Sequence, residues 1–413
     1  MILAHKIALD PNDVQATYFA RACGTARFAY NWALGEWQRQ YKEGGKPSEA
    51  ALRRQLNAVK REQFPWMLEV TKVAPQQAIK NLGSAFKRFF VGQGKYPQFK
   101  KKGIHDSFRA DNGPGTFELK DRRIKLPVIG WVRLREPLRF AGRPVSATVS
   151  RVADRWFVSV QVETEPKSVP ENQGKALAGT PFPLPPAQAE LARRAVGVDL
   201  GVKALATTSD GGVFEGPKAL RYYLAKLKRL SRSLSRKVKG SANRRKAKAR
   251  LARLHARISN IRKDALHKLT TDLARRFQVI GIEDLNVRGM LANEKLARSI
   301  ADMGFYEFRR QLEYKVKLHG GIVVAAPRFY PSSKTCSACG HVVPTLPLSV
   351  REWTCPACGV VHDRDHNAAV NLERLAVSST VTACGEESSG GWLAPVVKLA
   401  SVKQESSTKP TYA

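Results

Sequence analysis

Two Cys-x-x-Cys pairs, separated by fifteen residues, constrain the fold of this chain more than any other feature. Each pair puts two thiolates on one tight turn, and two such turns close a tetrahedron around Zn²⁺. A redox dithiol would instead show one pair beside a strand–helix unit. Because four thiolates saturate the ion, we expect a structural zinc rather than a catalytic one. The predicted zinc ligands are Cys336, Cys339, Cys355 and Cys358.

The other two cysteines, Cys23 and Cys384, stand alone, and we expect an ordinary buried thiol and a tail residue. This use of cysteine fits metal ligation in a reducing cytosol. No apolar run approaches the roughly 20 residues needed to span a bilayer. The first fifteen residues lack the basic-then-apolar layout of a signal peptide. The prediction is a cytoplasmic protein.

Charge points to the class of partner. The chain has 413 residues, and 70 Lys and Arg against 35 Asp and Glu give it a net charge of +35. Such a charge repels itself unless a polyanion neutralises it, and nucleic acid is the obvious polyanion. A ribosomal-type or salt-tolerant surface is the alternative interpretation. An acidic membrane fits less well, since no basic segment has a strongly apolar opposite face.

The first half changes its pattern twice. Residues 1–12 read as a strand, and 13–92 place apolar residues three and four apart, as helices do. Residues 106–165 alternate in the manner of a small antiparallel sheet or barrel. A Pro-, Gly- and Ala-rich linker at 166–194 then separates the two halves.

The second half interleaves strands and helices, which predicts an α/β fold. Residues 217–277 read as an antiparallel helical hairpin broken near Gly240, followed by a strand at 277–285 and a helix at 293–318. In the hairpin, lysines and arginines far outnumber the acids. Because like charges on one helix repel, this excess favours a phosphate-facing surface over simple solubility.

Acidic residues close two apolar strands of this half. Asp199 follows Ala195–Val198, and Glu283 follows Val279–Ile282. An acid at the end of a buried strand costs desolvation unless a cation offsets it, although acids also serve there as caps and turn formers. If the two strands are adjacent, their carboxylates converge.

A third source of acids lies at the start of a helix expected at 366–375. Asp363 and Asp365 offer the hard oxygen ligands that Mg²⁺ prefers. Two Mg²⁺ ions held among three carboxylates would activate a water and stabilise the leaving oxygen of a phosphodiester. Since thiolates satisfy the zinc, the nearby histidines are expected at the surface or beside the metal sites. These are His341, His362 and His366.

At this point the sequence resembles a known family. GVDLG around Asp199, IGIEDLNVRGM around Glu283 and DRDHNAAVNL around Asp365 resemble the three acidic motifs of a RuvC-like nuclease, and the cysteines lie between the second and third. This order resembles the TnpB family, transposon-encoded RNA-guided DNA endonucleases related to type V CRISPR effectors. ARFAYNWAL, FFVGQGKYPQFKKKG and RFYPSSKTCSACG match as well, so the likeness covers residues 1 to about 375.

The resemblance implies a fold of α/β plus β type, an RNase H-like (RuvC) nuclease with an inserted zinc ribbon, preceded by a wedge-type β-barrel that carries a helical recognition insert. By position, the barrel would be 1–12 and 101–165, the insert 13–100, the nuclease 195–330 and 362–375, and the ribbon 331–361. We expect a disordered tail at 376–413.

It also implies that Asp199, Glu283 and Asp365 bind Mg²⁺ and are catalytic. Asp365, which precedes the sequence xNAA, matches the family's acid better than Asp363, which we expect to cap the helix or support the site. Asp284 is expected in a turn. The partners would be a guide RNA from the transposon end and a target DNA that carries a short motif next to the target sequence. When bound to DNA, the cytoplasmic protein would be associated with the nucleoid.

Nucleic-acid contacts are expected at the basic loop Lys100, Lys101 and Lys102, whose alternative is a solvated loop, and at Lys334. Two other functions stay open. An RNA-guided DNA-binding repressor descended from such a nuclease would be favoured by the loss of an acid, and all three are present. A DNA transposase would also use three acids, but the motif order and the ribbon favour the nuclease.

Overall fold

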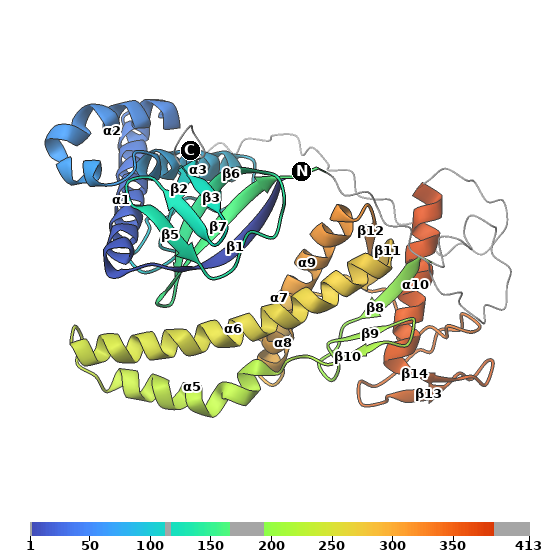
Figure 1. Cartoon of the computed structure of the whole chain (residues 1–413). Helices are drawn as coiled ribbons and strands as arrows, with labels where there is room; N and C mark the ends of the chain where they lie inside the picture. Colours follow the sequence, from blue (N-terminus) through green and yellow to red (C-terminus); the bar gives the residue numbers. More distant parts are fainter. Residues whose placement is uncertain (1, 112–116, 166–193, 384–413) are drawn as a thin grey trace, which may run out of the picture. The chain divides into compact units, whose positions relative to one another are not determined.

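The computed structural model of the chain describes residues 2–111, 117–165 and 194–383, and it contains two compact units (Figure 1). The predicted linker and most of the predicted tail lie outside these residues. Within them, no helix has the length and apolar character that crossing a membrane requires. The first unit comprises Met1–Glu171, Gly216–Thr271 and Val287–Gln311, and the second comprises Asn172–Glu215, Asp272–Asn286 and Leu312–Ala413.

The first unit contains a seven-stranded antiparallel sheet in the order β2-β6-β7-β1-β5-β4-β3. Alternation along the sequence builds it: in β7, every second side chain from Trp156 to Val162 is buried. Among the described residues the edge strands β2 and β3 do not pair with each other, so no closed barrel forms. The strands are β1 (Ile2–Asp10), β2 (Ser107–Asp111), β3 (Glu118–Lys120), β4 (Arg123–Leu126), β5 (Gly130–Leu134), β6 (Arg143–Val152) and β7 (Arg155–Glu163).

Helices pack on this sheet and share one hydrophobic core with it. Asn12 and Gln15 form a capping box that begins the first helix, and Trp37 stacks on Phe86 with ring centroids 4.1 Å apart. Phe86 is buried in this core, Trp37 and Phe89 pack against it half-buried, and Phe90 is exposed. The elements are α1 (Asp13–Lys42), α2 (Glu49–Gln63), the 3₁₀ helix η1 (Pro65–Glu69) and α3 (Val73–Phe90).

The basic hairpin forms as expected from α5 (Ala219–Ser235) and α6 (Ala242–Arg276) (Figure 1). The single helix expected at 293–318 is wrong. Gly304 adopts a left-handed conformation with φ of 74°, which ends one helix and begins the next. The segment contains α8 (Ala297–Met303) and α9 (Phe305–Leu318), preceded by α7 (Val287–Ala292).

The second unit is built on a five-stranded sheet in the order β10-β9-β8-β11-β12, so the α/β prediction is confirmed. β8, β11 and β12 are parallel, while β9 and β10 run antiparallel at one side. The three parallel strands end at the same edge of the sheet. The strands are β8 (Ala195–Asp199), β9 (Ala206–Thr208), β10 (Val213–Phe214), β11 (Val279–Glu283) and β12 (Ile322–Ala326).

Helix α10 (Arg364–Ala383) lies against this sheet, and the cysteine region precedes it with a two-stranded sheet of β13 (Glu352–Thr354) and β14 (Val361–Asp363) (Figure 1). The helix expected at 366–375 is thus longer at both ends. Residues 376–383, which we expected in a disordered tail, are helical because Ala376 and Val377 pack against the strands.

Candidate functional site

The register of β8 and β11 brings two of the predicted acids to one edge of the sheet. Val198 lies opposite Ile282 in the parallel pair, and the next residues are Asp199 and Glu283. Both acids are half-buried, whereas the four residues before each are fully buried. The adjacency on which the sequence argument depended is therefore present.

Two glycines let α10 approach this sheet closely. Gly197 and Gly281 lie opposite each other in the β8–β11 pair. A Cβ atom on Gly197 would overlap the carbonyl oxygen of Ala369, and one on Gly281 would overlap that of Leu372. Backbone of the helix therefore rests on backbone of the strands. Each glycine precedes a predicted catalytic acid by two residues. This spacing is a sequence signal for the close approach of the helix, which was not predicted.

Asp365 stands in the first turn of α10 and completes the acidic group. Burial raises the pKa of the Asp199 carboxyl well above its usual range, and the charges of Glu283 and Asp365 raise it further, while Arg364 opposes them. Asp199 therefore lies within the electrostatic reach of both other acids.

Each of the other two acids has a partner from the cysteine region or the segment leading into it. The Ser332 hydroxyl donates to Oε1 of Glu283 at 2.6 Å. Nη1 of Arg351 lies 3.2 Å from Oδ1 of Asp365. Neither Ser332 nor Arg351 was predicted from the sequence. Nothing local in the chain connects Ser332 to Glu283, 49 residues away, or Arg351 to Asp365, 14 residues away.

The neighbouring acids have other partners. Asp363 caps α10, since its Oδ1 accepts a hydrogen bond from the backbone N–H of His366 at 2.8 Å. Asp284 pairs with Arg328 at 2.9 Å. The first arrangement agrees with the cap role expected for Asp363, while Asp284 lies in the irregular segment between β11 and α7, where no turn is assigned.

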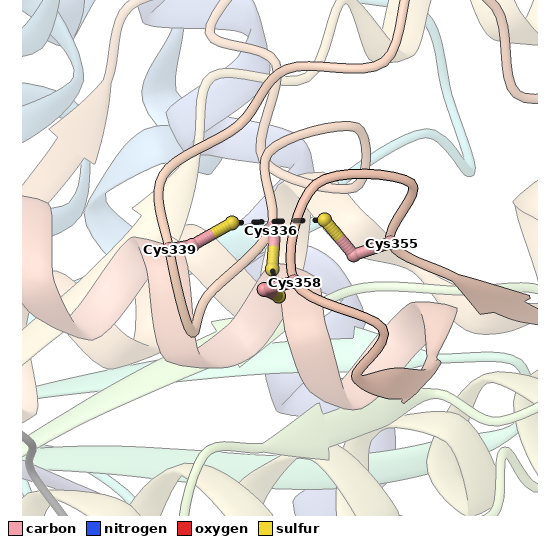
Figure 2. Close-up of side chains that lie close together, drawn as sticks. All are labelled: Cys336, Cys339, Cys355 and Cys358. Carbon is pink, nitrogen blue, oxygen red and sulfur yellow. Dashed lines mark hydrogen bonds between the residues drawn. The ribbon is translucent and has the colours of Figure 1, made fainter.

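The four cysteines form a compact cluster (Figure 2), whose sulfur atoms all lie within 4.8 Å of one another. Among the described residues, no other group of three or more His, Cys, Asp or Glu side chains offers metal ligands so closely gathered. The three acids are thus less tightly grouped than the thiols. Cys336 and Cys355 are buried, and Cys339 and Cys358 are exposed.

The two turns that carry the cysteines repeat one pattern of backbone hydrogen bonds. Gly340 N–H donates to the Cys336 carbonyl, and Gly359 N–H donates to that of Cys355, each at 2.9 Å. Both glycines have positive φ, which they adopt without strain. Although burial opposes ionisation of Cys355, backbone N–H groups and neighbouring thiols lower its pKa to about 6. Four thiols gathered this closely suit a tetrahedral zinc.

The remaining cysteine and histidine predictions divide by location. Cys23 is a buried thiol whose pKa burial raises to about 12, as expected for an unreactive residue. His362 is buried, with Nε2 3.0 Å from Sγ of Cys336, so it lies beside the cluster. His341 and His366 are exposed, and Nε2 of His366 lies 3.2 Å from the Ser209 carbonyl oxygen. Cys384 lies outside the described residues.

The predicted nucleic-acid lysines belong to different units, Lys100–Lys102 to the first and Lys334, two residues before Cys336, to the second. Lys101 and Lys102 are exposed, while the Lys100 ammonium lies 4.1 Å from the centroid of the Tyr30 ring and desolvation lowers its pKa. Lys334 donates to the Pro344 carbonyl at 2.9 Å. On the hairpin, α5 has a hollow lined mainly by basic residues. They are Lys228, Arg229, Arg232, Arg236 and Lys237.

Three family models match parts of the chain. The IS605 OrfB model, described as "Probable transposase", matches residues 158–294. The Cas12f1-like TNB domain matches 305–372, and a helix-turn-helix domain of IS605 OrfB matches 1–46. In the structure, residues 2–42 of the last segment contain β1 and α1.

Curated relatives match nearly the whole chain. A protein of Streptomyces pristinaespiralis, named "Putative RNA-guided DNA endonuclease", is 40% identical over 389 residues, covering 93% of this chain and 91% of the relative. InsQ of Escherichia coli K12, which has the same description, is 36% identical over 403 residues, covering 93% of this chain and 94% of the relative.

Among solved structures, that of a Cas12f1–sgRNA–target DNA complex covers 88% of this chain and 83% of its own, with a TM-score of 0.56 and 16% sequence identity. At that identity the likeness shows the fold alone, a fold shared with a Cas12 effector. The relatives, matched at 36 to 40% identity over almost their full length, show the family. This chain belongs to the TnpB family, which is also described as IS605 OrfB.

Proposed function

We propose that this protein is an RNA-guided DNA endonuclease that hydrolyses phosphodiester bonds with Mg²⁺, and that it is encoded by a transposon. The names of its relatives support this activity. The observation that carries the proposal is the register of β8 and β11, in which two neighbouring parallel strands end in Asp199 and Glu283. The net charge of +35 suits a protein that holds RNA and DNA together.

In this proposal, Asp199, Glu283 and Asp365 hold the catalytic magnesium. Burial raises the pKa of the Asp199 carboxyl and repulsion from the other two acids raises it further, and bound divalent cations would offset both effects. Bound Mg²⁺ would supply Lewis acidity and lower the pKa of an attacking water. The chain itself would contribute the acid centre, at the carboxyl ends of β8 and β11 and the first turn of α10.

The four cysteines hold a structural Zn²⁺ in this proposal. Four thiolates leave no open coordination position, so the ion has no catalytic role. Its effect is to keep two short loops folded next to the acid centre. The match of residues 305–372 to a TNB domain supports a function of this ribbon within the nuclease.

The first unit would recognise nucleic acid. Its antiparallel sheet and helices α1 to α3 would then be the wedge-type module and helical insert that the family resemblance implies, although the described strands do not close a barrel. We propose that the guide RNA and the guide–target duplex follow basic surfaces such as the α5 hollow. The loop Lys100–Lys102 and Lys334 remain proposed contacts.

A plasmid cleavage assay tests this function. The protein is purified with its RNA, the RNA is sequenced, and supercoiled plasmids with and without the matching target are incubated with Mg²⁺. We expect cuts in the matching plasmid only, and none from Asp199→Ala. Asp284→Asn serves as the matched control because its carboxylate pairs with Arg328. Target cleavage by Asp199→Ala equal to that of the wild type would refute the proposal.

The same assay separates the alternatives. The family description "Probable transposase" makes strand transfer the relevant competitor. Joined donor and target strands in the products would indicate a transposase. Guided binding without any cut would indicate a repressor.

A further inference from the structure

Ser332 is a buried residue in contact with a proposed catalytic acid. Its side chain donates to Oε1 of Glu283 at 2.6 Å, and only 3% of the residue is exposed. It belongs to the segment that leads into the first cysteine turn, four residues before Cys336. The hydrogen bond therefore joins the ribbon to the acid centre.

The backbone around Ser332 is held by two buried asparagines of α10. Nδ2 of Asn371 donates to the Ser332 carbonyl at 2.8 Å and to the Thr335 carbonyl at 2.7 Å. Nδ2 of Asn367 donates to the same Thr335 carbonyl at 2.8 Å. The Oδ1 atom of Asn367 accepts from the backbone N–H of Ser337 at 2.9 Å.

These contacts use the two faces of one helix. Asn367 and Asn371, four residues apart, face the ribbon segment, while the α10 backbone at Ala369 rests on the strands. Asp365 stands in the first turn of the same helix. The helix therefore carries Asp365 and also holds the backbone from which the Ser332 hydroxyl reaches Glu283.

We propose that Ser332 is a positioning residue for Glu283. Its hydroxyl holds one carboxylate oxygen, which fixes the side-chain rotamer and leaves the second oxygen for a divalent cation. Partners of this kind orient metal ligands, and their loss commonly weakens metal binding or activity by about 10- to 100-fold. Asn367 and Asn371 keep the hydroxyl in place. This inference rests on the proposed function, since it concerns the same acid centre.

The test compares Ser332→Ala with Ser332→Thr, which retains the hydroxyl, and with Ser333→Ala in the same loop. Mn²⁺ serves as the probe ion and is titrated into the full chain with its RNA, with bound ion measured by electron paramagnetic resonance. The Asp199→Ala protein, titrated in parallel, gives the background from RNA. Zinc content and Tm show whether each variant is folded.

We expect Ser332→Ala to bind Mn²⁺ about tenfold more weakly at the acid centre and to lose kcat by a similar factor. KM for target DNA should stay unchanged, because the DNA surface is untouched. Ser332→Thr should recover most of the affinity, and Ser333→Ala should behave as the wild type. All variants should keep one zinc per chain.

Wild-type Mn²⁺ affinity in a folded Ser332→Ala protein would overturn the inference, as would equal losses in Ser332→Ala and Ser333→Ala. Absence of Mn²⁺ binding by the wild type above the Asp199→Ala background would overturn it as well. If the wild type binds Mn²⁺ but cuts no guided target, the proposed function fails, and the Mn²⁺ titration of Ser332→Ala still decides whether Ser332 positions Glu283.

Discussion

The two candidate metal centres of the second unit are assembled in different ways. The four thiols come from two short loops, each closed by its own backbone hydrogen bonds and a glycine at positive φ. The three acids come from two strands and a helix that are far apart in the sequence. A cluster built from local turns can therefore be predicted from the spacing of its residues. The positions of side chains at strand ends depend instead on how the strands pair in the sheet.

The largest expected effect concerns the thiols, because zinc binding and the folding of small zinc modules are the same free energy, about 10 kcal/mol or more. Cys336→Ser should lose the zinc and unfold the segment 331–361, while β8, β11 and β12 stay folded. Zinc analysis and hydrogen exchange measure both results. Cys23→Ala, which removes a thiol of the first unit, should keep the zinc. Loss of exchange protection throughout the sheet would show that the ribbon is not an independent element.

Substitution of an acid should greatly reduce cleavage without lowering stability, whereas loss of a zinc ligand mainly lowers stability. Asp199→Asn should reduce target cleavage at least about 10³-fold, about 4 kcal/mol in transition-state free energy. In the metal-free protein it should raise Tm, since burial and repulsion make the charged carboxylate unfavourable. Cleavage kinetics and thermal unfolding without divalent ions measure the two effects. A fall in Tm would contradict the picture of crowded, uncompensated acids.

Close packing of α10 gives a third way to separate the centres. Gly281→Ala should cost about 1–3 kcal/mol in unfolding free energy, because the added methyl group meets the helix backbone. It should also reduce cleavage by moving Asp365 from the other acids, while zinc stays bound. Gly35→Ala is the control, since open space surrounds that position in α1 and alanine favours the helix. Denaturant unfolding measures the free energy of unfolding of both variants, and zinc analysis measures their zinc content. Equal stability of Gly281→Ala and Gly35→Ala would contradict the close packing of α10 on the sheet.

The smallest effect concerns Glu373, a buried acid of α10 outside both centres. Burial raises its pKa to about 7, against the hydrogen bond from Ser209. The folded protein therefore binds this proton more tightly than the unfolded chain, so the contribution to stability falls as pH rises from about 4.5 to about 7. Glu373→Gln should remove about 1–3 kcal/mol of that pH dependence. Unfolding free energies at pH 5 and pH 7.5 test it, and an unchanged slope would refute the assignment.

Features of the fold that depend on residues close together in the sequence were predictable, and those that depend on distant residues were not. The antiparallel strands, the basic hairpin and the α/β order followed from periodicity. The expected helix at 293–318 failed at Gly304, because a glycine inside a helical pattern does not reveal that it adopts a left-handed conformation. The longer α10 was missed because packing on the sheet, rather than local composition, keeps residues 376–383 helical.

By itself the sequence determined the cluster of four thiols, since two Cys-x-x-Cys turns carry their geometry in a few residues. It also indicated Asp199 and Glu283, because an acid at the end of a buried strand loses hydration free energy unless a cation offsets the loss. Only the tertiary structure decided that Ser332 and Arg351 contact the acids and that Gly197 and Gly281 admit the helix. The physical reason is that strand register and backbone packing join residues that no spacing along the chain connects.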